Sequence, residues 1–301
     1  MKQSFYSNGK LLLAGEYVVL DGANALGVPT VYGQYLDVTP DDSNTIKWRG
    51  LENDGSVWYE DEIGLGDILA GHGRQTAETA ALIKILHIAN KLNPAVLTRG
   101  YRIETRLSFP RKWGLGSSST LINNVAWWFG IDPYTLLWQS FGGSGYDIAC
   151  ARTSSPVIFR KEAGKAITEP VNFQPAFAEN LWFVYLNRKQ NSRTAIEHYR
   201  SRGNDNISLA KKINGVTSRM LSADGIEEFM EAMEAHEDAL SPALGMQPVK
   251  QLLFPDFDGA VKSLGAWGGD FILAASRNNP GSYFRNKGFE TIFSYNDMIL
   301  K

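Results

Sequence analysis

Residues 110–120 read Pro-Arg-Lys-Trp-Gly-Leu-Gly-Ser-Ser-Ser-Thr and separate a strand-like segment from a helical one. Apolar and polar residues alternate over 101–107, whereas apolar residues recur at helical spacing over 121–129. Glycines let the backbone turn tightly with its amides pointing inward, and a helix N-terminus adds unpaired N–H groups and a positive dipole end. The stretch therefore predicts a phosphate-binding loop, although an ordinary glycine turn before a serine-capped helix has the same pattern.

Two familiar phosphate motifs do not fit this loop. The P-loop motif ends in Gly-Lys-Ser/Thr, but here Ser117 follows Gly116. The dinucleotide-binding fingerprint requires a third glycine where Ser119 stands. The serines at 117–119 can cap the helix and also supply hydroxyls to phosphate oxygens or to Mg²⁺.

Two charged residues suit phosphoryl transfer. Asp147 ends the cluster Gly-Gly-Ser-Gly-Tyr-Asp at 142–147, and a positioned aspartate can orient or deprotonate an acceptor hydroxyl. Lys10 precedes the first expected strand, where it could favour the ionised form of Asp147 and neutralise charge on the transferred group. A turn-forming aspartate and a solvated surface lysine are the simpler alternatives. A third glycine cluster, 265–270, is either a hairpin turn or a wall of a cleft.

The remaining pattern predicts an α+β protein of two domains, residues 1–165 and 166–301. A loop is expected at 64–73 and a polar linker at 161–174. Strands are expected at 11–13, 17–20, 46–48, 57–59, 101–107, 157–160, 181–186, 260–264 and 271–275, and helices at 76–92, 121–129, from 132, 207–221 and 226–240.

Composition narrows the class of protein. The 301 residues are 44% hydrophobic and carry a formal net charge of -2, so no global field attracts nucleic acid or anionic lipid. One cysteine, Cys150, fits a reducing compartment, and the four scattered histidines suggest neither a metal cluster nor a nucleophile and base pair. We expect a soluble cytoplasmic protein, monomeric or homodimeric, with a small-molecule substrate and neither nucleic-acid nor membrane partners.

Three segments, taken together and in order, resemble the motifs of the GHMP kinase superfamily, which is named for galactokinase, homoserine kinase, mevalonate kinase and phosphomevalonate kinase. They are Gly-Lys-Leu-Leu-Leu-Ala-Gly-Glu-Tyr-Val-Val-Leu at 9–20, the Pro-x-x-x-Gly-Leu-Gly-Ser-Ser loop at 110–119, and residues 261–271. They span both expected domains. The resemblance implies a two-domain fold, with a first domain similar to ribosomal protein S5 domain 2 and a ferredoxin-like second domain.

Several details look like the phosphomevalonate kinase branch. Gly-Glu-Tyr stands at 15–17, Gln139 precedes Gly-Ser-Gly-Tyr-Asp-Ile-Ala at 143–149, and Gly-Gly-Asp ends the third motif at 268–270. No acidic residue near Leu136 matches the Mg²⁺ ligand of mevalonate kinases. Two departures from the family pattern are Asn8, in place of proline, and Trp267, in place of glycine, where a bulky side chain would reshape the substrate pocket.

The resemblance implies ATP and Mg²⁺ as cofactors and a role for each matching residue. Asp147 would be the catalytic carboxylate and Lys10 its basic partner. Ser118 would bind Mg²⁺, and the triphosphate would lie against Gly114, Leu115, Gly116, Ser117, Ser118 and Ser119. The acceptor would face Ser144, Lys189, Ser192, Arg193, Gly268 and Gly269.

The expected function is therefore phosphorylation of an alcohol or phosphomonoester, with phosphomevalonate or mevalonate of isoprenoid precursor synthesis as the leading acceptors. Two alternatives stay open. One is a decarboxylase similar to mevalonate diphosphate decarboxylase, and the other is a non-catalytic homologue that binds nucleotide. Trp48, Trp58 and Trp113 are candidate neighbours of adenine, although burial in the core also explains the first two.

Overall fold

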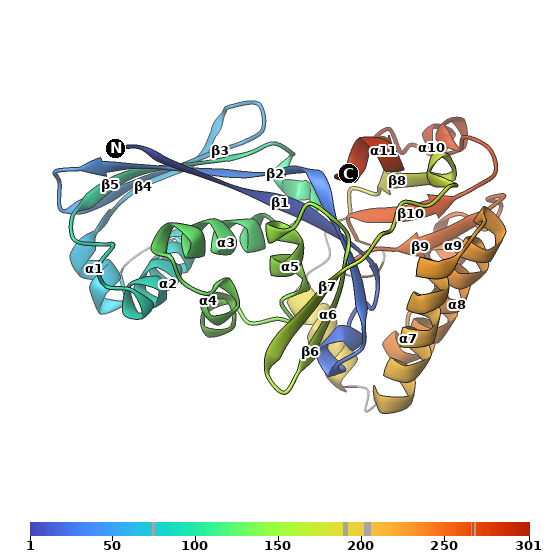
Figure 1. Cartoon of the computed structure of the whole chain (residues 1–301). Coiled ribbons are helices and arrows are strands. Elements are labelled where there is room, and N and C mark those ends of the chain that lie inside the picture. Colours follow the sequence, from blue (N-terminus) through green and yellow to red (C-terminus); the bar gives the residue numbers. More distant parts are fainter. Residues whose placement is uncertain (74–75, 189–191, 202–205, 266, 268) are drawn as a thin grey trace. The chain divides into compact units, whose positions relative to one another are not determined.

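The computed structural model describes residues 1–73, 76–188, 192–201, 206–265, 267 and 269–301, without the side chains of residues 192–195 and 198. The chain forms two compact units, each assembled from separate stretches of sequence (Figure 1). Unit 1 comprises Met1–Gly9, Tyr32–Arg111 and Leu115–Arg152, and unit 2 comprises Lys10–Val31, Lys112–Gly114 and Thr153–Lys301.

Unit 1 is a sheet with helices along one face (Figure 1). Its strands follow the order β4-β3-β5-β2, and β1 pairs with β2. β3 and β5 run parallel, with Trp48 opposite Ile103, whereas the β2–β5 and β3–β4 pairs are antiparallel. The elements are β1 (Gln3–Ala14), β2 (Ala25–Asp41), β3 (Thr45–Leu51), β4 (Val57–Gly64), α1 (Leu65–Ala70), α2 (Ala77–Leu92), β5 (Gly100–Leu107), the 3-10 turn η2 (Arg111–Trp113), α3 (Ser117–Phe129), α4 (Pro133–Ser140) and α5 (Tyr146–Arg152).

The core of unit 1 is built from strands with alternating apolar residues and from helices with apolar residues at helical spacing. In β3, Ile46 and Trp48 alternate with exposed residues and point into the core, because successive side chains of a strand face opposite sides. In α2, a stripe at helical spacing is buried, and the Thr76 side chain accepts the Thr79 N–H at 3.2 Å to cap the helix. The expected helix at 76–92 is therefore confirmed.

Unit 2 contains a hairpin, an antiparallel sheet and a layer of helices. The hairpin strand β6 pairs with the start of β2, with Ala25 opposite Phe159, and the sheet has the order β11-β8-β10-β9. The long helices α7 and α8 lie side by side (Figure 1). The elements are the 3-10 turn η1 (Val18–Asp21), β6 (Val157–Glu162), β7 (Lys165–Pro170), the 3-10 turn η3 (Ala178–Asn180), β8 (Leu181–Tyr185), α6 (Ser192–Ser201), α7 (Asn206–Ser222), α8 (Ile226–Leu244), α9 (Val249–Leu253), β9 (Ala260–Ser263), β10 (Phe271–Ala275), α10 (Gly281–Asn286), β11 (Ile292–Ser294) and α11 (Tyr295–Met298).

Three sequence expectations about secondary structure are wrong. The strand expected at 17–20 is wrong, because Tyr17 has φ 62° and caps the 3-10 turn η1, and the Val19 N–H bonds back to the Gly15 carbonyl at 3.0 Å. Residues 64–73 contain α1, which ends at Gly71 in the left-handed region. The expected linker at 161–174 contains the strand β7. Most side chains of β7 are exposed, so its sequence is polar and does not alternate with apolar residues.

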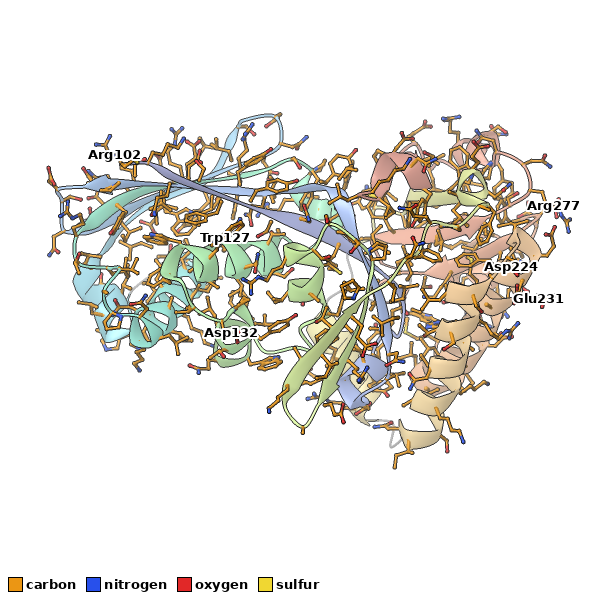
Figure 2. The ribbon with its side chains drawn as sticks, viewed as in Figure 1. Arg102, Trp127, Asp132, Asp224, Glu231 and Arg277 are labelled. Carbon is orange, nitrogen blue, oxygen red and sulfur yellow. The ribbon has the colours of Figure 1, made fainter. Side chains whose placement is uncertain are left out.

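Trp127 belongs to the helical apolar pattern at 121–129 but does not lie in the core. Trp127 and Trp128 are neighbours on α3, so they point in different directions around the helix. Trp128 is 7% exposed and packs in the core of unit 1, whereas Trp127 is 57% exposed (Figure 2). In the described ranges, no helix combines the length and the apolar character needed to span a bilayer.

Candidate nucleotide and phosphate site

The predicted phosphate loop leads into α3, and the N-cap residue of this helix is Gly116 and not one of the serines. Gly116 is the N-cap of α3, with φ 92° and no side-chain cap hydrogen bond, so the serines lie inside the first turn. The Ser119 and Thr120 hydroxyls donate to the Gly116 carbonyl at 2.8 and 3.1 Å, whereas Ser118 is exposed. The first-turn amides and the Ser118 hydroxyl therefore suit an anion. Of the predicted loop residues, unit 1 contains Leu115, Gly116, Ser117, Ser118 and Ser119, and unit 2 contains Gly114.

A buried polar network holds α3 against the strands of unit 1. The Asn124 side chain donates to the Gln34 carbonyl of β2 at 2.9 Å and accepts the Ser7 hydroxyl of β1 at 2.7 Å. One turn earlier, the Thr120 hydroxyl donates to the Gln34 side chain at 2.8 Å. These polar residues on an otherwise apolar helix fix where the phosphate loop ends, and sequence analysis did not single them out.

A pocket of about 170 Å³ opens beside the phosphate loop within unit 1. Trp58 lines it and packs under the Arg111 guanidinium, which lies 4.1 Å from the ring centroid. Trp48 also lines it but is only 2% exposed. Ser117 and Ser118 contribute to the same pocket, which therefore joins an aromatic wall to the phosphate loop.

The backbone of β3 passes so close to the Trp58 ring that position 50 requires glycine. A Cβ added to Gly50 would lie 2.8 Å from the Trp58 Nε1 atom, and Gly50 is also where the β3–β4 register shifts. Glycine at this position thus places the indole of Trp58 directly against the β3 backbone.

Asp147 and Ser144 lie at the start of α5 in unit 1. Asp147 is partly buried in the first turn of the helix, after Gly145, which has φ 105° and whose carbonyl accepts the Ile148 and Ala149 N–H groups. Ser144 is buried, and its carbonyl accepts the Trp138 indole N–H at 3.4 Å. The glycine turn therefore delivers Asp147 on a helix N-terminus and not on a free loop.

Lys10 and Asp270 both contact Gly114 in unit 2. The Lys10 ammonium donates to the Gly114 carbonyl at 3.4 Å. A Cβ added to Gly114 would lie 1.8 Å from Asp270 Oδ2, and Gly114 has φ 69°, so only glycine fits. Because Lys10 and Asp147 fall in different units, their pairing stays a prediction.

The residues just before Gly114 are held by the sheet of unit 2. The Tyr185 hydroxyl donates to the Lys112 carbonyl at 2.9 Å, and the Trp113 ring meets Phe271 and Phe293 edge-on at centroid distances of 5.8 and 5.1 Å. Trp113 is therefore an anchor of the loop on this sheet, while Trp58 lines the aromatic pocket.

The predicted acceptor residues are only partly described. Lys189 and Gly268 lie outside the described residues, as do the side chains of Ser192 and Arg193 in α6. Gly269 is buried in the turn before β10. The roles proposed for these residues stay predictions.

Trp267, which departs from the family pattern, is buried in the core of unit 2. It has φ 41°, is 1% exposed, and its indole N–H donates to the Gln247 carbonyl at 3.2 Å. It packs in one apolar cluster with Tyr17 and Tyr199. Its backbone is therefore held in a glycine-like conformation by side-chain burial.

A buried ion pair lies behind the turn at residues 15–17. The Lys262 ammonium donates to Glu16 Oε1, and both side chains are at most 1% exposed. His236 Nε2 accepts the Gly15 N–H at 3.0 Å, so the ring is neutral there. Burial and the Lys262 charge hold the pKa of His236 well below its usual range.

Glu237 adds a second carboxyl to this cluster. Its Oε2 accepts the Ser263 hydroxyl at 3.3 Å. Burial, opposed by the charge of Lys262 and reinforced by that of Glu16, raises the pKa of Glu237 to about 8. Sequence analysis missed Lys262, His236 and Glu237, although charged residues inside the apolar patterns at 226–240 and 260–264 were a signal.

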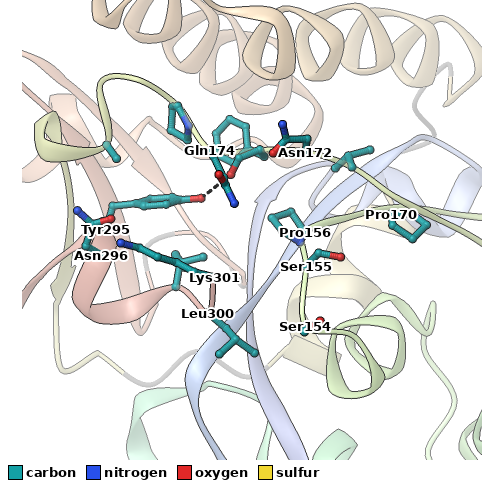
Figure 3. A pocket seen from close by; sticks show the side chains of 15 residues that line it. Ser154, Ser155, Pro156, Pro170, Asn172, Gln174, Tyr295, Asn296, Leu300 and Lys301 are labelled. Atoms are coloured by element: carbon teal, nitrogen blue, oxygen red, sulfur yellow. Dashed lines mark hydrogen bonds between the residues drawn. The ribbon is translucent and has the colours of Figure 1, made fainter.

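A larger pocket, of about 480 Å³, lies elsewhere in unit 2. It is lined by residues between 154 and 178 and by the last residues of the chain, and the Tyr295 hydroxyl beside it donates to the Phe173 carbonyl at 3.0 Å (Figure 3). None of the predicted site residues lines this pocket.

Comparison of the structure with solved proteins identifies the fold. Phosphomevalonate kinase of Streptococcus pneumoniae, in complex with phosphomevalonate and AMPPNP, matches with a TM-score of 0.73 at 16% identity over 97% of this chain and 99% of that one. Mevalonate kinase of Methanococcus jannaschii matches with 0.72 at 14% identity over 100% and 99%. Lactococcus lactis galactokinase, complexed with galactose, matches with 0.71 at 13% identity over 99% and 93%.

The chain therefore has the two-domain α+β fold of the GHMP kinases. Its similarity reaches both the mevalonate and the phosphomevalonate kinases of that superfamily. No protein-family model matches the sequence. No curated protein matches it either.

The buried ion pair between Glu16 and Lys262 predicts a large loss of folding stability when one of the two side chains is replaced. Lys262→Met leaves the Glu16 carboxylate unpaired in the core, which costs about 3–5 kcal/mol. Combining it with Glu16→Gln should recover much of this loss, as urea denaturation of the full chain would measure. The exposed pair Lys287 and Asp256 is the control, since Lys287→Met should change the unfolding free energy by less than about 1 kcal/mol. Equal effects at both lysines would contradict the assignment.

The titratable residues Glu237 and His236 beside this ion pair predict opposite effects of pH on folding stability. Because folding raises the pKa of Glu237 from 4.5 to about 8, the unfolded chain releases a proton that the folded chain keeps, and stability falls as pH rises through this window. Because folding lowers the pKa of His236 from 6.5, stability is also lost as pH falls below 6.5.

Denaturation of wild type and Glu237→Gln between pH 5 and 8.5 tests the first effect. The stability of the variant relative to wild type should rise with pH, by about 1.4 kcal/mol for each unit of pKa shift that the substitution removes. A difference that does not depend on pH would show that Glu237 titrates normally.

Proposed function

We propose that the chain is an ATP- and Mg²⁺-dependent kinase of small molecules, of the GHMP superfamily. The observation that carries this proposal is the aromatic pocket of unit 1, which opens onto the glycine-capped N-terminus of α3. A purine ring and a phosphate chain need these two environments side by side. The fold is one that kinases of mevalonate, phosphomevalonate and galactose use.

In this proposal Trp58 holds the adenine and α3 holds the phosphates. The Trp58 ring offers a stacking surface whose position is set by Arg111 and Gly50. The first-turn amides of α3 would donate to the phosphate oxygens. The exposed Ser118 hydroxyl is an oxygen donor of the kind that Mg²⁺ accepts, and bound Mg²⁺ would neutralise charge on the phosphates.

Asp147 and Lys10 take the chemical roles. Asp147 would accept the proton of the acceptor hydroxyl from its place in the first turn of α5. Lys10 would neutralise charge on the transferred phosphoryl group while its contact with the Gly114 carbonyl keeps it at the phosphate loop. Most of the catalysis would come from positioning and charge neutralisation.

We propose phosphomevalonate or mevalonate as the acceptor. The support is the Gly-Glu-Tyr and Gly-Gly-Asp pattern of the first and third motifs, together with basic residues Lys189 and Arg193 that would suit a phosphate. A cytoplasmic location, an assembly of one or two copies and domains at 1–165 and 166–301 belong to the same proposal.

Asp147→Asn should abolish turnover and leave ATP binding intact. Loss of the general base costs at least about 100-fold in kcat, while the Kd for ATP should stay within about threefold, since α3 and Trp58 are unchanged. ADP release measured with mevalonate, phosphomevalonate, galactose and homoserine provides the readout. Glu104→Gln, a half-buried carboxylate of the same unit, is the matched control. Retained turnover in Asp147→Asn would contradict its role as the general base. If the wild-type protein released no ADP with any of these acceptors, the proposed kinase activity would be contradicted.

Trp58→Ala should weaken ATP binding at the pocket. Stacking of a base on an aromatic ring contributes about 1–3 kcal/mol, so the Kd should rise at least about fivefold in calorimetric titration with AMPPNP. Trp127→Ala removes an exposed indole from α3 outside the pocket and should leave the Kd unchanged. Equal effects of the two substitutions would mean that Trp58 does not hold the base.

A further inference from the structure

A cation covers the ring of Trp58, on which adenine stacks in the proposed function. The Arg111 guanidinium lies over this ring, with its Cζ atom 4.1 Å from the ring centroid. Stacked atoms of two flat groups approach each other to about 3.5–4.0 Å. The guanidinium therefore occupies the volume that a base stacked on this face of the indole would need.

The indole of Trp58 cannot turn away to offer the same face elsewhere. The register of the β3–β4 pair shifts between Gly50 and Leu51, so Trp58 is the extra residue of a bulge, which aims its side chain. A Cβ added to Gly50 would lie within 3.1 Å of the Nε1, Cε2 and Cζ2 atoms of the indole, so the β3 backbone lies against this edge. For a base to stack here, Arg111 has to move.

The contacts that hold Arg111 over the ring are weak enough to exchange. Its Nε donates to Glu52 Oε1 at 3.1 Å, and the two side chains are 43% and 23% exposed. An ion pair that water reaches contributes little, and a cation above an exposed ring contributes a similarly small amount. A ligand that gives the guanidinium a better partner can therefore draw it away from Trp58.

The phosphates of a nucleotide would be that better partner. Arg111 belongs to the phosphate loop at 110–120 and lines the same pocket of about 170 Å³ as Ser117 and Ser118, in the first turn of α3. A guanidinium that leaves Trp58 thus stays beside the amides that would bind phosphate. Its planar set of donors matches phosphate oxygens in pairs, with stronger hydrogen bonds than neutral donors make.

We propose that Arg111 makes this site selective for nucleotides over nucleosides, by moving from the Trp58 ring to the phosphates when the base stacks. The inference rests on the proposed nucleotide site and adds to it a residue that determines specificity. A nucleoside has to displace the guanidinium and offers it no anion in return. A nucleotide displaces the same group but supplies its new partner, so Arg111 opposes the first ligand and favours the second.

A purely structural role for Arg111 would have a different effect on binding. If the guanidinium only held Trp58 and the loop in place, its removal would weaken the binding of every ligand that stacks on the ring. The exchange of partners requires effects of opposite sign on a nucleoside and on a nucleotide. Adenosine and AMPPNP carry the same base and sugar, so comparing them isolates the contribution of the phosphates.

Calorimetric titration of the full chain with adenosine and with Mg²⁺–AMPPNP tests the proposal. Arg111→Met keeps an unbranched side chain and removes the charge. Adenosine should bind about two- to fivefold more tightly, since it no longer displaces a cation from the ring. AMPPNP should bind at least about tenfold more weakly, since its phosphates lose charge-assisted hydrogen bonds. The ratio of the two dissociation constants should change at least about 20-fold in favour of adenosine.

Two further variants keep the test decisive. Glu52→Gln frees Arg111 from its carboxylate partner, so it should tighten adenosine binding severalfold without weakening AMPPNP, and it serves if Arg111→Met does not fold. Arg102→Met removes an arginine that is 67% exposed and paired with Asp41 on the same sheet, outside this pocket, and should change neither affinity (Figure 2).

The possible outcomes separate this inference from the proposed function. If Arg111→Met weakened both ligands alike, left adenosine unaffected, or changed affinities no more than Arg102→Met, the selective role of Arg111 would be wrong while the nucleotide site stood. If the wild-type protein bound neither ligand, the proposed function itself would be overturned, and this inference with it.

Discussion

The buried pair between Glu16 and Lys262 is the constraint on which unit 2 depends. It joins the turn after β1 to β9, two segments 246 residues apart in the sequence. Two charges in a core stabilise little on their own, because desolvation offsets their attraction, but neither can leave the other without a large penalty. The pair therefore specifies that the turn after β1 packs against β9. His236 of α8 stabilises the same turn by accepting the Gly15 N–H. The first and third sequence motifs are held together in this way.

Glycine acts at the phosphate loop for two separate reasons. Gly116 starts α3 from the left-handed region, so the amides of the first turn stay available. Gly114 leaves room for the Asp270 carboxylate and carries the carbonyl that Lys10 contacts. One glycine thus prepares a site for an anion, and the other lets the third motif approach the loop. A side chain at either position would be strained whatever its chemistry.

Elements with a strong period or a strong cap were predictable from the sequence. The helix that begins after Thr76 has both, and its bounds were right to within one residue. The strand β7 was missed because an edge strand with exposed side chains owes its structure to pairing with β6, which leaves no apolar alternation. The turn η1 was missed because apolar residues at 17–20 are as typical of a strand, and only the positive φ of Tyr17 separates the two.

The sequence by itself determined the order of the motifs, the glycines of the phosphate loop and the α+β class, because these depend on local backbone freedom and on periodicity along the chain. Only the tertiary structure showed that Trp58 and Arg111 line a pocket beside α3, and that Glu237 lies buried beside Glu16 and Lys262. Burial and charge pairing between distant segments decide such facts. The local pattern singles out Trp58 and marks Glu237 as a charged residue in an apolar stretch, but the pKa of Glu237 and the environment of Trp58 arise from residues far away in the sequence.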